Sequence, residues 1–273
     1  MLGDLTLAAK VTQAAAALAL GHFHSGSDWW EKSPGDPVGV ADLEVDAYIK
    51  FALLGARAGD GWLSEETADT ADRLQRRRGW VVDPIDGTRD FVRGRTGWAV
   101  SVALVEDGVV TVAALAAPAR GQLFTAALGQ GARCNGELLA MSPLTSLAGV
   151  RLPMDAANLS APFWPSPWPG DVVEKPNSLA LRMAKLASAE ADAWLEGRTI
   201  AEWDVAAAAL ILTEAGGRVT DRHGEALAFN KPVPVFHGIA AANPALHAEV
   251  LARLDHALKV FAARRAAAPP PAV

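Results

Sequence analysis

Apolar residues recur at helical spacing in four parts of the chain. The segments that we predict to be helices are residues 5–21, 43–54, 179–191 and 205–215. Gly21 ends the first segment, and Gly216 follows the last, as is typical just past the end of a helix. Asp42 lies immediately before the second segment. We therefore expect four packed helices, two of them terminated by glycine.

Runs of branched and aromatic residues predict strands between these helices. Residues 80–82 are typical of a short buried strand, and residues 97–105 and 109–115 are two further strands joined by an Asp-Gly turn. Residues 143–175 are the least regular, because the Pro- and Trp-rich segment 161–170 fits neither a helix nor a central strand. The pattern predicts an α+β protein. Its predicted parts are an N-terminal half (1–143), a C-terminal α/β half that completes the site (144–265), and a disordered Ala/Pro tail (266–273).

Composition narrows the class of protein. The chain has 273 residues, 51% of them apolar, which is enough for a sizeable core and excludes a disordered or fibrous protein. A net charge of -6 disfavours binding to long nucleic acids. The single Cys134 excludes an internal disulfide, and the apolar run 14–20 is too short to span a bilayer. We expect a cytoplasmic protein that does not bind membranes.

Carboxylates stand where the predicted secondary structure changes. They are Glu65 and Glu66, then Asp83 and Asp86 after a strand, and Asp204 before a helix. Taken alone, each of these acidic residues most often caps a helix or lies in a solvated turn. If they converge, their repulsion requires a cation or a shared proton. A ligand set made only of oxygens favours a hard ion such as Mg2+ over zinc.

The segment from Asp83 to Thr88 combines these carboxylates with an anion site. Pro84 fixes the turn between the two aspartates and leaves the carbonyl of Ile85 as a further oxygen ligand. If a helix begins at Gly87 and Thr88, its free N–H groups can bind an anion next to the metal. A metal site beside an anion site indicates phosphoryl chemistry.

These motifs resemble those of the inositol monophosphatase superfamily over residues 5–254. The matching segments are Glu65-Glu66, residues 80–91, residues 202–207 and residues 214–217. The resemblance implies a layered αβαβα sandwich of the inositol monophosphatase and fructose-1,6-bisphosphatase type. It also implies a phosphomonoesterase that uses two or three Mg2+ ions, is inhibited by Li+, and acts on a small phosphorylated substrate. Homodimers are common among relatives, so we leave a homodimer open.

The resemblance also assigns roles to individual residues. The implied metal ligands are Glu65, Asp83, the carbonyl of Ile85, Asp86 and Asp204. The implied catalytic residues are Thr88, Asp42 and Glu65, and the implied substrate-binding residues are Gly87, Thr88 and Glu196. Two departures stand out, because Gly39 replaces the usual Thr before Asp42, and Asn177-Ser178 replaces a common Gly-Ser pair.

Motif details favour one substrate and leave others open. Residues 63–66, residues 72–74 and the Arg and Asp that follow Thr88 resemble bacterial 3'(2'),5'-bisphosphate nucleotidases of the CysQ type, which act on adenosine 3',5'-bisphosphate. Glu196 resembles a residue of inositol-1-monophosphatases, and a histidinol-phosphatase is a further alternative. A haloacid-dehalogenase-like enzyme is disfavoured, because its second Asp stands at i+2 whereas Asp86 stands at i+3 from Asp83. A non-catalytic, metal-dependent binding protein is the alternative from another class.

Two further segments each have two interpretations. The arginines at positions 73, 76, 77 and 78 either hold a second phosphate or form a solvated loop. Trp164 and Trp168 either stack on an adenine or pack as a lid over the site.

Overall fold

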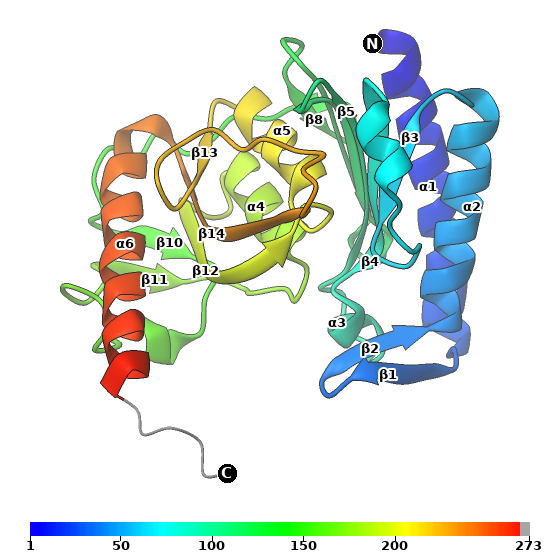
Figure 1. Ribbon diagram of the computed structural model, residues 1–273. Helices are drawn as coiled ribbons and strands as arrows, with labels where there is room; N and C mark the ends of the chain where they lie inside the picture. The colour runs from blue at the N-terminus through cyan, green and yellow to red at the C-terminus, as the bar shows by residue number, and fades with distance from the viewer. Residues whose placement is uncertain (268–273) are drawn as a thin grey trace.

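The computed structural model describes residues 1–267 and consists of five layers. Helices and sheets alternate in the order helix pair, large sheet, helix pair, small sheet, helix (Figure 1). The helices are α1 (Leu2–Ser25), α2 (Val40–Ala56), α3 (Thr88–Phe91), α4 (Leu179–Ala187), α5 (Ala206–Glu214) and α6 (Pro244–Ala267). Short 3-10 helices lie at Ala71–Gln75, Pro118–Arg120 and Ala156–Asn158. This is the layered αβαβα sandwich that the resemblance implies.

The large sheet has the strand order β3-β4-β5-β6-β7-β8-β9. Its strands are β3 (Gly61–Ser64), β4 (Arg78–Asp86), β5 (Ala99–Glu106), β6 (Val109–Ala117), β7 (Gln122–Ala127), β8 (Ala132–Cys134) and β9 (Glu137–Leu138). Only β3 and β4 run parallel, and every other neighbouring pair is antiparallel. The parallel pair places the ends of β3 and β4 at the same edge of the sheet. Asp83 and Asp86 lie in the last part of β4, and Glu65 follows directly after β3.

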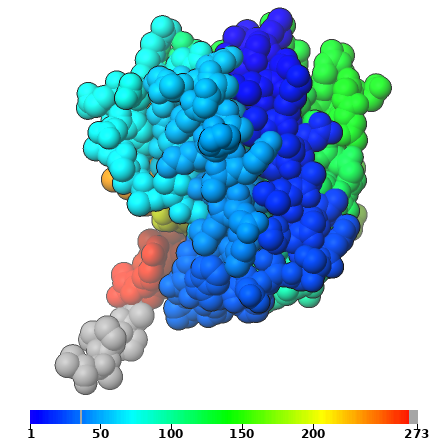
Figure 2. Space-filling model, turned by 90° about the vertical axis from the view of Figure 1, so that its right-hand side faces the viewer, coloured from blue at the N-terminus to red at the C-terminus, as the bar shows by residue number. Residues whose placement is uncertain are grey.

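Both faces of this sheet are covered. On β4, Trp80 and Val82 pack with α1 and α2, whereas Val81 faces the central helices. Figure 2 shows the outer surface of this layer, where α1 and α2 lie against each other. Strands buried on both faces consist of nearly continuous apolar residues, which is why the sequence of β5 and β6 shows little alternation.

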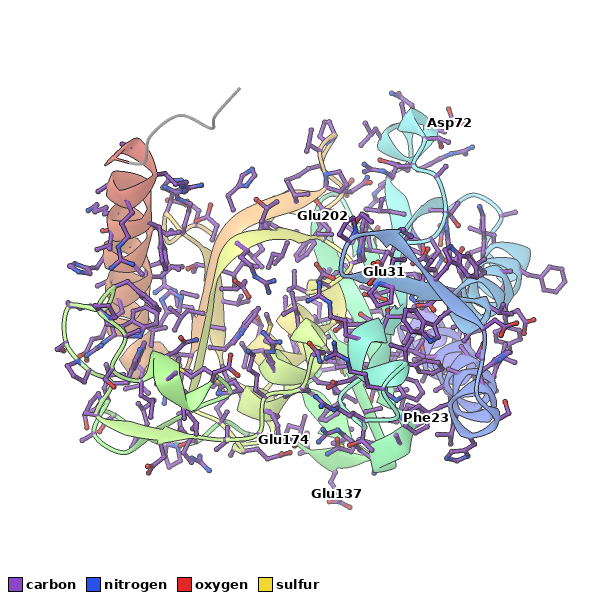
Figure 3. The ribbon with its side chains drawn as sticks, turned by 90° about the horizontal axis from the view of Figure 1, so that it is seen from below. Phe23, Glu31, Asp72, Glu137, Glu174 and Glu202 are labelled. Atoms are coloured by element: carbon purple, nitrogen blue, oxygen red, sulfur yellow. The ribbon has the colours of Figure 1, made fainter. Side chains whose placement is uncertain are left out.

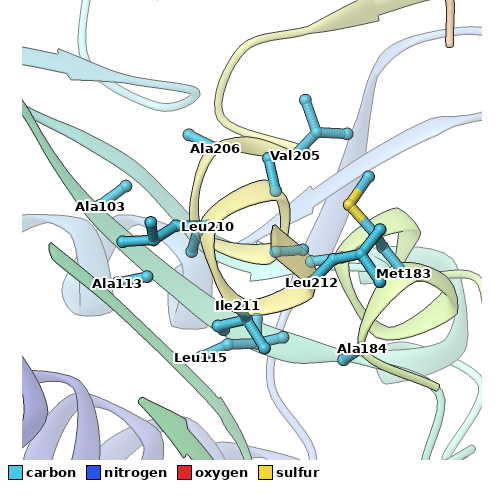
Figure 4. Packing of buried hydrophobic residues seen from close by; sticks show 14 of the residues in the cluster. Ala103, Ala113, Leu115, Met183, Ala184, Val205, Ala206, Leu210, Ile211 and Leu212 are labelled. Atoms are coloured by element: carbon cyan, nitrogen blue, oxygen red, sulfur yellow. The ribbon is translucent and has the colours of Figure 1, made fainter. Parts of the chain in front are cut away.

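Helices α4 and α5 fill the space between the two sheets. Residues 206–212 of α5 are all buried, because the helix is apolar on every side. Figure 4 shows Leu210 and Ile211 of α5 packed with Ala113 and Leu115 of the large sheet, and Met183 of α4 beside the same helix. The core is therefore continuous from one sheet to the other.

The small sheet has the order β12-β14-β13, and α6 covers its outer face (Figures 1 and 3). Its strands are β12 (Ala193–Ala201), β13 (Arg218–Asp221) and β14 (Val235–Ala242). Two strand pairs lie outside the sheets: the hairpin of β1 (Trp29–Ser33) and β2 (Asp36–Gly39), and the parallel pair of β10 (Val150–Leu152) and β11 (Gly170–Val172). The predicted boundary between the two halves of the chain, at residues 143 and 144, falls in the connection between β9 and β10.

The predicted helices are present, with different ends. The first runs past Gly21 to Ser25, because Gly26 with a φ of 75° is the residue that ends it. The predicted tail was wrong at its start, since α6 continues through Ala267, and its remainder, 268–273, lies outside the described residues. Among residues 1–267, no helix combines the length and apolar character needed to cross a membrane.

Candidate active site

A sharp turn at the end of β4 builds the first part of the site. The pairing of β4 with β5 shifts register between Asp83 and Asp86, so the strand bends where both aspartates stand. Gly87 follows with a φ of 94°, and a Cβ there would lie 2.7 Å from the carbonyl oxygen of Gly97. Only glycine fits this turn without strain. Thr88 then begins α3.

Three carboxylates converge at this turn. Asp83, Asp86 and Asp204 each offer an oxygen, and these oxygens lie within 4.8 Å of one another. Asp204 comes from the segment between β12 and α5, so its approach depends on packing of the small sheet and α5 against the large sheet. Burial, reinforced by the neighbouring carboxylates, raises the pKa of Asp83 and of Asp204 well above the ordinary value. Such repulsion is relieved by a cation.

The donor set fits a hard metal ion. Oδ1 of Asp83 is buried and has no hydrogen-bond partner among the described residues. An unpaired buried carboxylate oxygen is costly unless something binds it. All three side chains offer only oxygen, the ligand that Mg2+ prefers. The arrangement can therefore hold a divalent cation.

Asp86 is oriented by the start of α4. Its Oδ2 accepts hydrogen bonds from Oγ of Ser178 at 2.5 Å and from the amide of Ala180 at 2.8 Å. Burial raises the pKa of Asp86 to about 6, although these bonds favour the ionised form. The positive end of α4 acts in the same direction as the bonds. Ser178, half of the unusual Asn-Ser pair, is thus a site residue that the motif alone did not reveal.

Glu65 lies next to the three aspartates and outside their 4.8 Å cluster. The hairpin β1–β2 brings Lys32 to it, with Nζ 3.1 Å from Oε1 of Glu65 and 2.7 Å from Oε1 of Glu66. Burial raises the pKa of Glu65 to about 7. Burial alone would lower the pKa of Lys32, but the two glutamates outweigh it and raise that pKa. The hairpin, which carries the labelled Glu31 in Figure 3, therefore supplies a positive charge at the site.

Thr88 and Asp42 form a second unit of the site. Oγ1 of Thr88 lies 2.9 Å from the carbonyl oxygen of Ile85 and 3.3 Å from Oδ1 of Asp42. Asp42 stands in the first turn of α2 and accepts a 2.8 Å hydrogen bond from the amide of Gly39. Burial raises the pKa of Asp42 to about 7. A hydroxyl between a carboxylate and a carbonyl is suited to orient a water molecule.

The departure at Gly39 has a local reason. A Cβ at this position would lie 3.0 Å from the carbonyl oxygen of Asp28 and 3.4 Å from Oδ2 of Asp42. The hairpin approaches α2 closely here, so glycine leaves room for it. The substitution for the usual Thr does not displace Asp42 from Thr88.

A cavity of about 490 Å³ opens at the site, and Asp42 lines a separate cavity behind Thr88. Glu65, Asp83, Asp86, Thr88 and Asp204 line the first cavity. So does Glu196 of β12, but both of its oxygens are held by the guanidinium of Arg198, at 3.1 Å and 2.9 Å. Burial opposes ionisation of Glu196, yet Arg198 outweighs it and lowers its pKa. A glutamate so engaged is less free to accept hydrogen bonds from a polyol.

The arginine cluster at 73–78 does not reach the cavity. Arg73 is buried and bonds to Asp69 and Asn230. Arg77 pairs with Asp107, Arg78 pairs with Asp60, and none of the four arginines lines the cavity within residues 1–267. The interpretation as a second-phosphate site was therefore wrong. The cavity instead has Arg182 and Arg198, which the sequence did not single out.

The two tryptophans of the irregular segment differ. Trp168 is buried beneath Arg253, whose Cζ lies 4.4 Å from the ring centre. Trp164 is half-buried and lines the cavity. Trp168 thus packs within the protein, and only Trp164 can touch a ligand.

Comparison with known proteins places this site in a family. The model of the inositol monophosphatase family matches residues 4–259. The chain belongs to the inositol monophosphatase family. It is a phosphoric monoester hydrolase of this metal-dependent family, whose members are typically sensitive to lithium.

Individual relatives resemble most of the chain. A Streptomyces griseus protein named glucose-1-phosphate thymidylyltransferase is 34% identical over 230 residues, covering 81% of this chain and 86% of that protein. The inositol-1-monophosphatase SuhB of Mycobacterium tuberculosis is 34% identical over 249 residues, covering 82% and 80%. The solved IMPase of Thermotoga maritima superposes with a TM-score of 0.81 at 26% identity, covering 95% and 99%.

Proposed function

We propose that this chain hydrolyses a small phosphate monoester with the help of Mg2+. The observation that carries the proposal is the convergence of Asp83, Asp86 and Asp204 in a cavity that Thr88 also lines, with a buried oxygen of Asp83 that has no hydrogen-bond partner among residues 1–267. Glu65 and the carbonyl of Ile85 complete the proposed ligands. Bound Mg2+ would supply a Lewis acid that lowers the pKa of water and offsets the charge of the phosphoryl group.

The chain's own groups position the reactants. We infer that the amides of Gly87 and Thr88 bind the phosphate oxygens where β4 turns into α3. The hydroxyl of Thr88, held by Asp42, orients the attacking water and passes its proton toward that carboxylate. Water adds to phosphorus in line as the P–O bond to the alcohol breaks. The departing alcohol oxygen takes up a proton from solvent, and Asp42 returns the proton of the attacking water to solvent.

Two substrates remain in competition under this proposal. Adenosine 3',5'-bisphosphate is the first, as the motif details indicate, and the cavity also has Arg182, whose Nε and Nη2 donate to the carbonyls of Pro176 and Asn177 and whose charge suits a second anionic group. Inositol 1-phosphate is the second, because several relatives carry the name inositol-1-monophosphatase and Glu196 lines the cavity. The pairing of Glu196 with Arg198 favours the first. A cytoplasmic location and a homodimer stay predictions.

The decisive experiment is phosphate release from a panel of esters. The purified chain is assayed with adenosine 3',5'-bisphosphate, inositol 1-phosphate, histidinol phosphate and fructose 1,6-bisphosphate, with Mg2+, with EDTA, and with Mg2+ plus Li+. A preparation of Asp83→Asn made in the same way controls for contaminating phosphatases. We expect turnover that requires Mg2+ and falls with Li+. Preference for inositol phosphate would overturn the nucleotide assignment, and no turnover of any ester would overturn the hydrolase mechanism.

Two further assay arms test other reactions. One contains dTTP and glucose 1-phosphate, the pair that the name of the Streptomyces griseus relative suggests, and we expect no sugar nucleotide. The other quenches the reaction in acid to trap a phosphoaspartate. We expect none, because Asp83, Asp86 and Asp204 are assigned to the cation, and a trapped phosphoaspartate would revive a covalent mechanism.

A further inference from the structure

One wall of the cavity is apolar. Residues 153–164 and the second half of α6 build it, and its main side chains are Met154, Phe163, Trp164, Leu254, Leu258 and Phe261. The ring centres of Phe163 and Phe261 lie 4.9 Å apart, and those of Phe163 and Trp164 lie 4.7 Å apart. We call Phe163, Trp164 and Phe261 the aromatic wall. It belongs to the same cavity as Asp83 and Thr88.

The aromatic wall is held in place by contacts behind it. Arg253 of α6 stacks on the ring of Trp168 and donates a 2.9 Å hydrogen bond to the carbonyl of Ser166. Trp168 meets Trp164 edge to face at 5.5 Å, and the indole N–H of Trp164 donates to the carbonyl of Asn158. The loop that carries Phe163 and Trp164 is therefore fixed to α6 before any ligand binds. Such preorganised rings lose little entropy on binding.

A second arrangement brings α6 close to the polar part of the cavity. The pairing of β12 with β14 shifts register between Glu196 and Thr199, and a Cβ on Gly197 would lie 3.4 Å from Cδ2 of Leu258. The lack of a side chain at Gly197 lets Leu258 pack against β12 beside Glu196. The apolar wall thus begins directly next to Glu196.

The apolar side chains of this wall favour one kind of alcohol in the phosphate ester over another. A cavity of about 490 Å³ lies in the range of pockets that bind drug-sized ligands. The hydroxyls of a polyol would face rings that cannot accept or donate hydrogen bonds, which is unfavourable. A flat aromatic group would instead stack on the rings and bury the exposed surface of Phe261, which is 37% exposed.

We propose that the aromatic wall binds a planar aromatic group on the alcohol of the phosphate ester, such as a nucleobase or a simple aryl ring. The proposal rests on the proposed function for the phosphate end of the substrate and adds the class of alcohol. It assigns Phe261 and Phe163 as specificity residues. Trp168, buried under Arg253, takes no part in contact with the substrate.

The test compares two esters with similar leaving groups, 2-phenylethyl phosphate and ethyl phosphate. In the native chain we expect kcat/KM to be at least about tenfold higher for the phenylethyl ester, mostly through KM. Phe261→Ala and Phe163→Ala should each lower kcat/KM for the phenylethyl ester until most of this preference is lost, and Phe261→Trp should retain the preference. Phe51→Ala is the matched control, since Phe51 on α2 is 82% exposed and does not line the cavity.

The result distinguishes failure of the wall from failure of the hydrolase. Equal kcat/KM for both esters would overturn the proposed role of the aromatic wall and leave the phosphatase activity in place. A Phe261→Ala variant that lowers kcat/KM for both esters alike would do the same. If neither ester is hydrolysed, the affinity of each ester is measured by calorimetry in the presence of Ca2+. Tighter binding of the phenylethyl ester that is lost in Phe261→Ala supports the proposed role of the wall, and equal or absent binding overturns it. Adenosine 2'-monophosphate, tested beside the phenylethyl ester, separates a nucleobase site from a simple aryl site.

Discussion

The amide of Ala180 lies 2.8 Å from Oδ2 of Asp86 and donates a hydrogen bond to it. Asp86 belongs to β4 of the large sheet, and Ala180 belongs to the first turn of α4 in the central layer. Ser178, the N-cap of α4, bonds to the same oxygen and also to the amide of Leu181. The start of one helix therefore fixes the direction of a proposed metal ligand on another layer.

Ser178→Ala should weaken the site more than the fold. The loss of an N-cap costs about 1 kcal/mol of stability, and Asp86 loses one of its three hydrogen-bond donors. We expect the Mg2+ concentration for half-maximal activity to rise about threefold to tenfold, as measured by Mg2+ titration of phosphate release. Ser188→Ala at the other end of α4 is the matched control and should leave the titration unchanged. An unchanged titration for Ser178→Ala would show that Asp86 does not depend on this contact.

Asp83→Asn tests whether the acidic cluster is built for a cation. Because Oδ1 of Asp83 has no hydrogen-bond partner among the described residues, an amide of the same shape removes charge with little loss of contacts. We expect Mg2+-dependent turnover to disappear and the metal-free protein to melt at a higher temperature, since like charges no longer repel. Thermal unfolding with Mg2+ and with EDTA measures both effects.

The control for Asp83→Asn is Asp107→Asn. Asp107 stands in the exposed turn between β5 and β6 with a φ of 50°, a conformation that Asn tolerates. This variant should keep both activity and the stabilisation by Mg2+. If Asp83→Asn kept the native Mg2+ stabilisation, Asp83 would have no place in a metal site.

Thr88→Ala tests the proposed handling of water. The hydroxyl of Thr88 contacts Asp42 and the carbonyl of Ile85, and its loss leaves the attacking water without orientation. We expect kcat to fall about 100-fold or more at saturating Mg2+, with the Mg2+ titration little changed. Thr88→Ser should restore much of the activity because it keeps the hydroxyl. A raised Mg2+ requirement with native kcat would instead give Thr88 a role in metal binding.

Much of the site could be predicted from the sequence because its central part is local. Asp83, Ile85, Asp86 and Thr88 follow one another, so the end of one buried strand already brings metal ligands and an anion site together. The spacing of apolar residues also located α1, α2, α4 and α5, but it missed α6, the helix that covers the small sheet. What local pattern could not supply is the approach of Asp204, which depends on packing between layers.

The residues that the sequence missed are brought in by distant parts of the chain. Ser178 reaches Asp86 across 92 positions, and Lys32 reaches Glu65 across 33. The interpretation of Arg73 was wrong for the same reason, because its partner Asn230 is 157 positions away and no local charge pattern indicates that contact. Tertiary pairing decides whether a charged residue lines a cavity or stabilises the fold.

The ion pair of Asp192 and Arg151 predicts how stability depends on pH. Asp192 is buried and accepts hydrogen bonds from the amide, Nε and Nη2 of Arg151 at 2.8, 2.9 and 2.8 Å, which joins β10 to the start of β12. Burial opposes its ionisation, but these bonds outweigh burial and lower its pKa below the ordinary value of 3.8. The carboxyl group of Asp192 therefore binds a proton less tightly in the folded protein than in the unfolded chain. Because of this difference, the ion pair stabilises the fold above about pH 4, and its contribution is lost as the pH falls toward the lowered pKa.

Asp192→Asn should remove that contribution. We expect a loss of about 1 to 3 kcal/mol in the free energy of urea unfolding at neutral pH, since Arg151 keeps only part of its acceptor. The difference from the native chain should shrink as the pH falls below the ordinary value of 3.8 and approaches the lowered pKa of Asp192 in the folded protein. Asp255→Asn is the control, because Asp255 pairs with Lys259 on the exposed face of α6, and it should change stability by less than about 0.5 kcal/mol. A loss that stays constant with pH would mean that Asp192 stabilises the fold by shape alone and not through its charge.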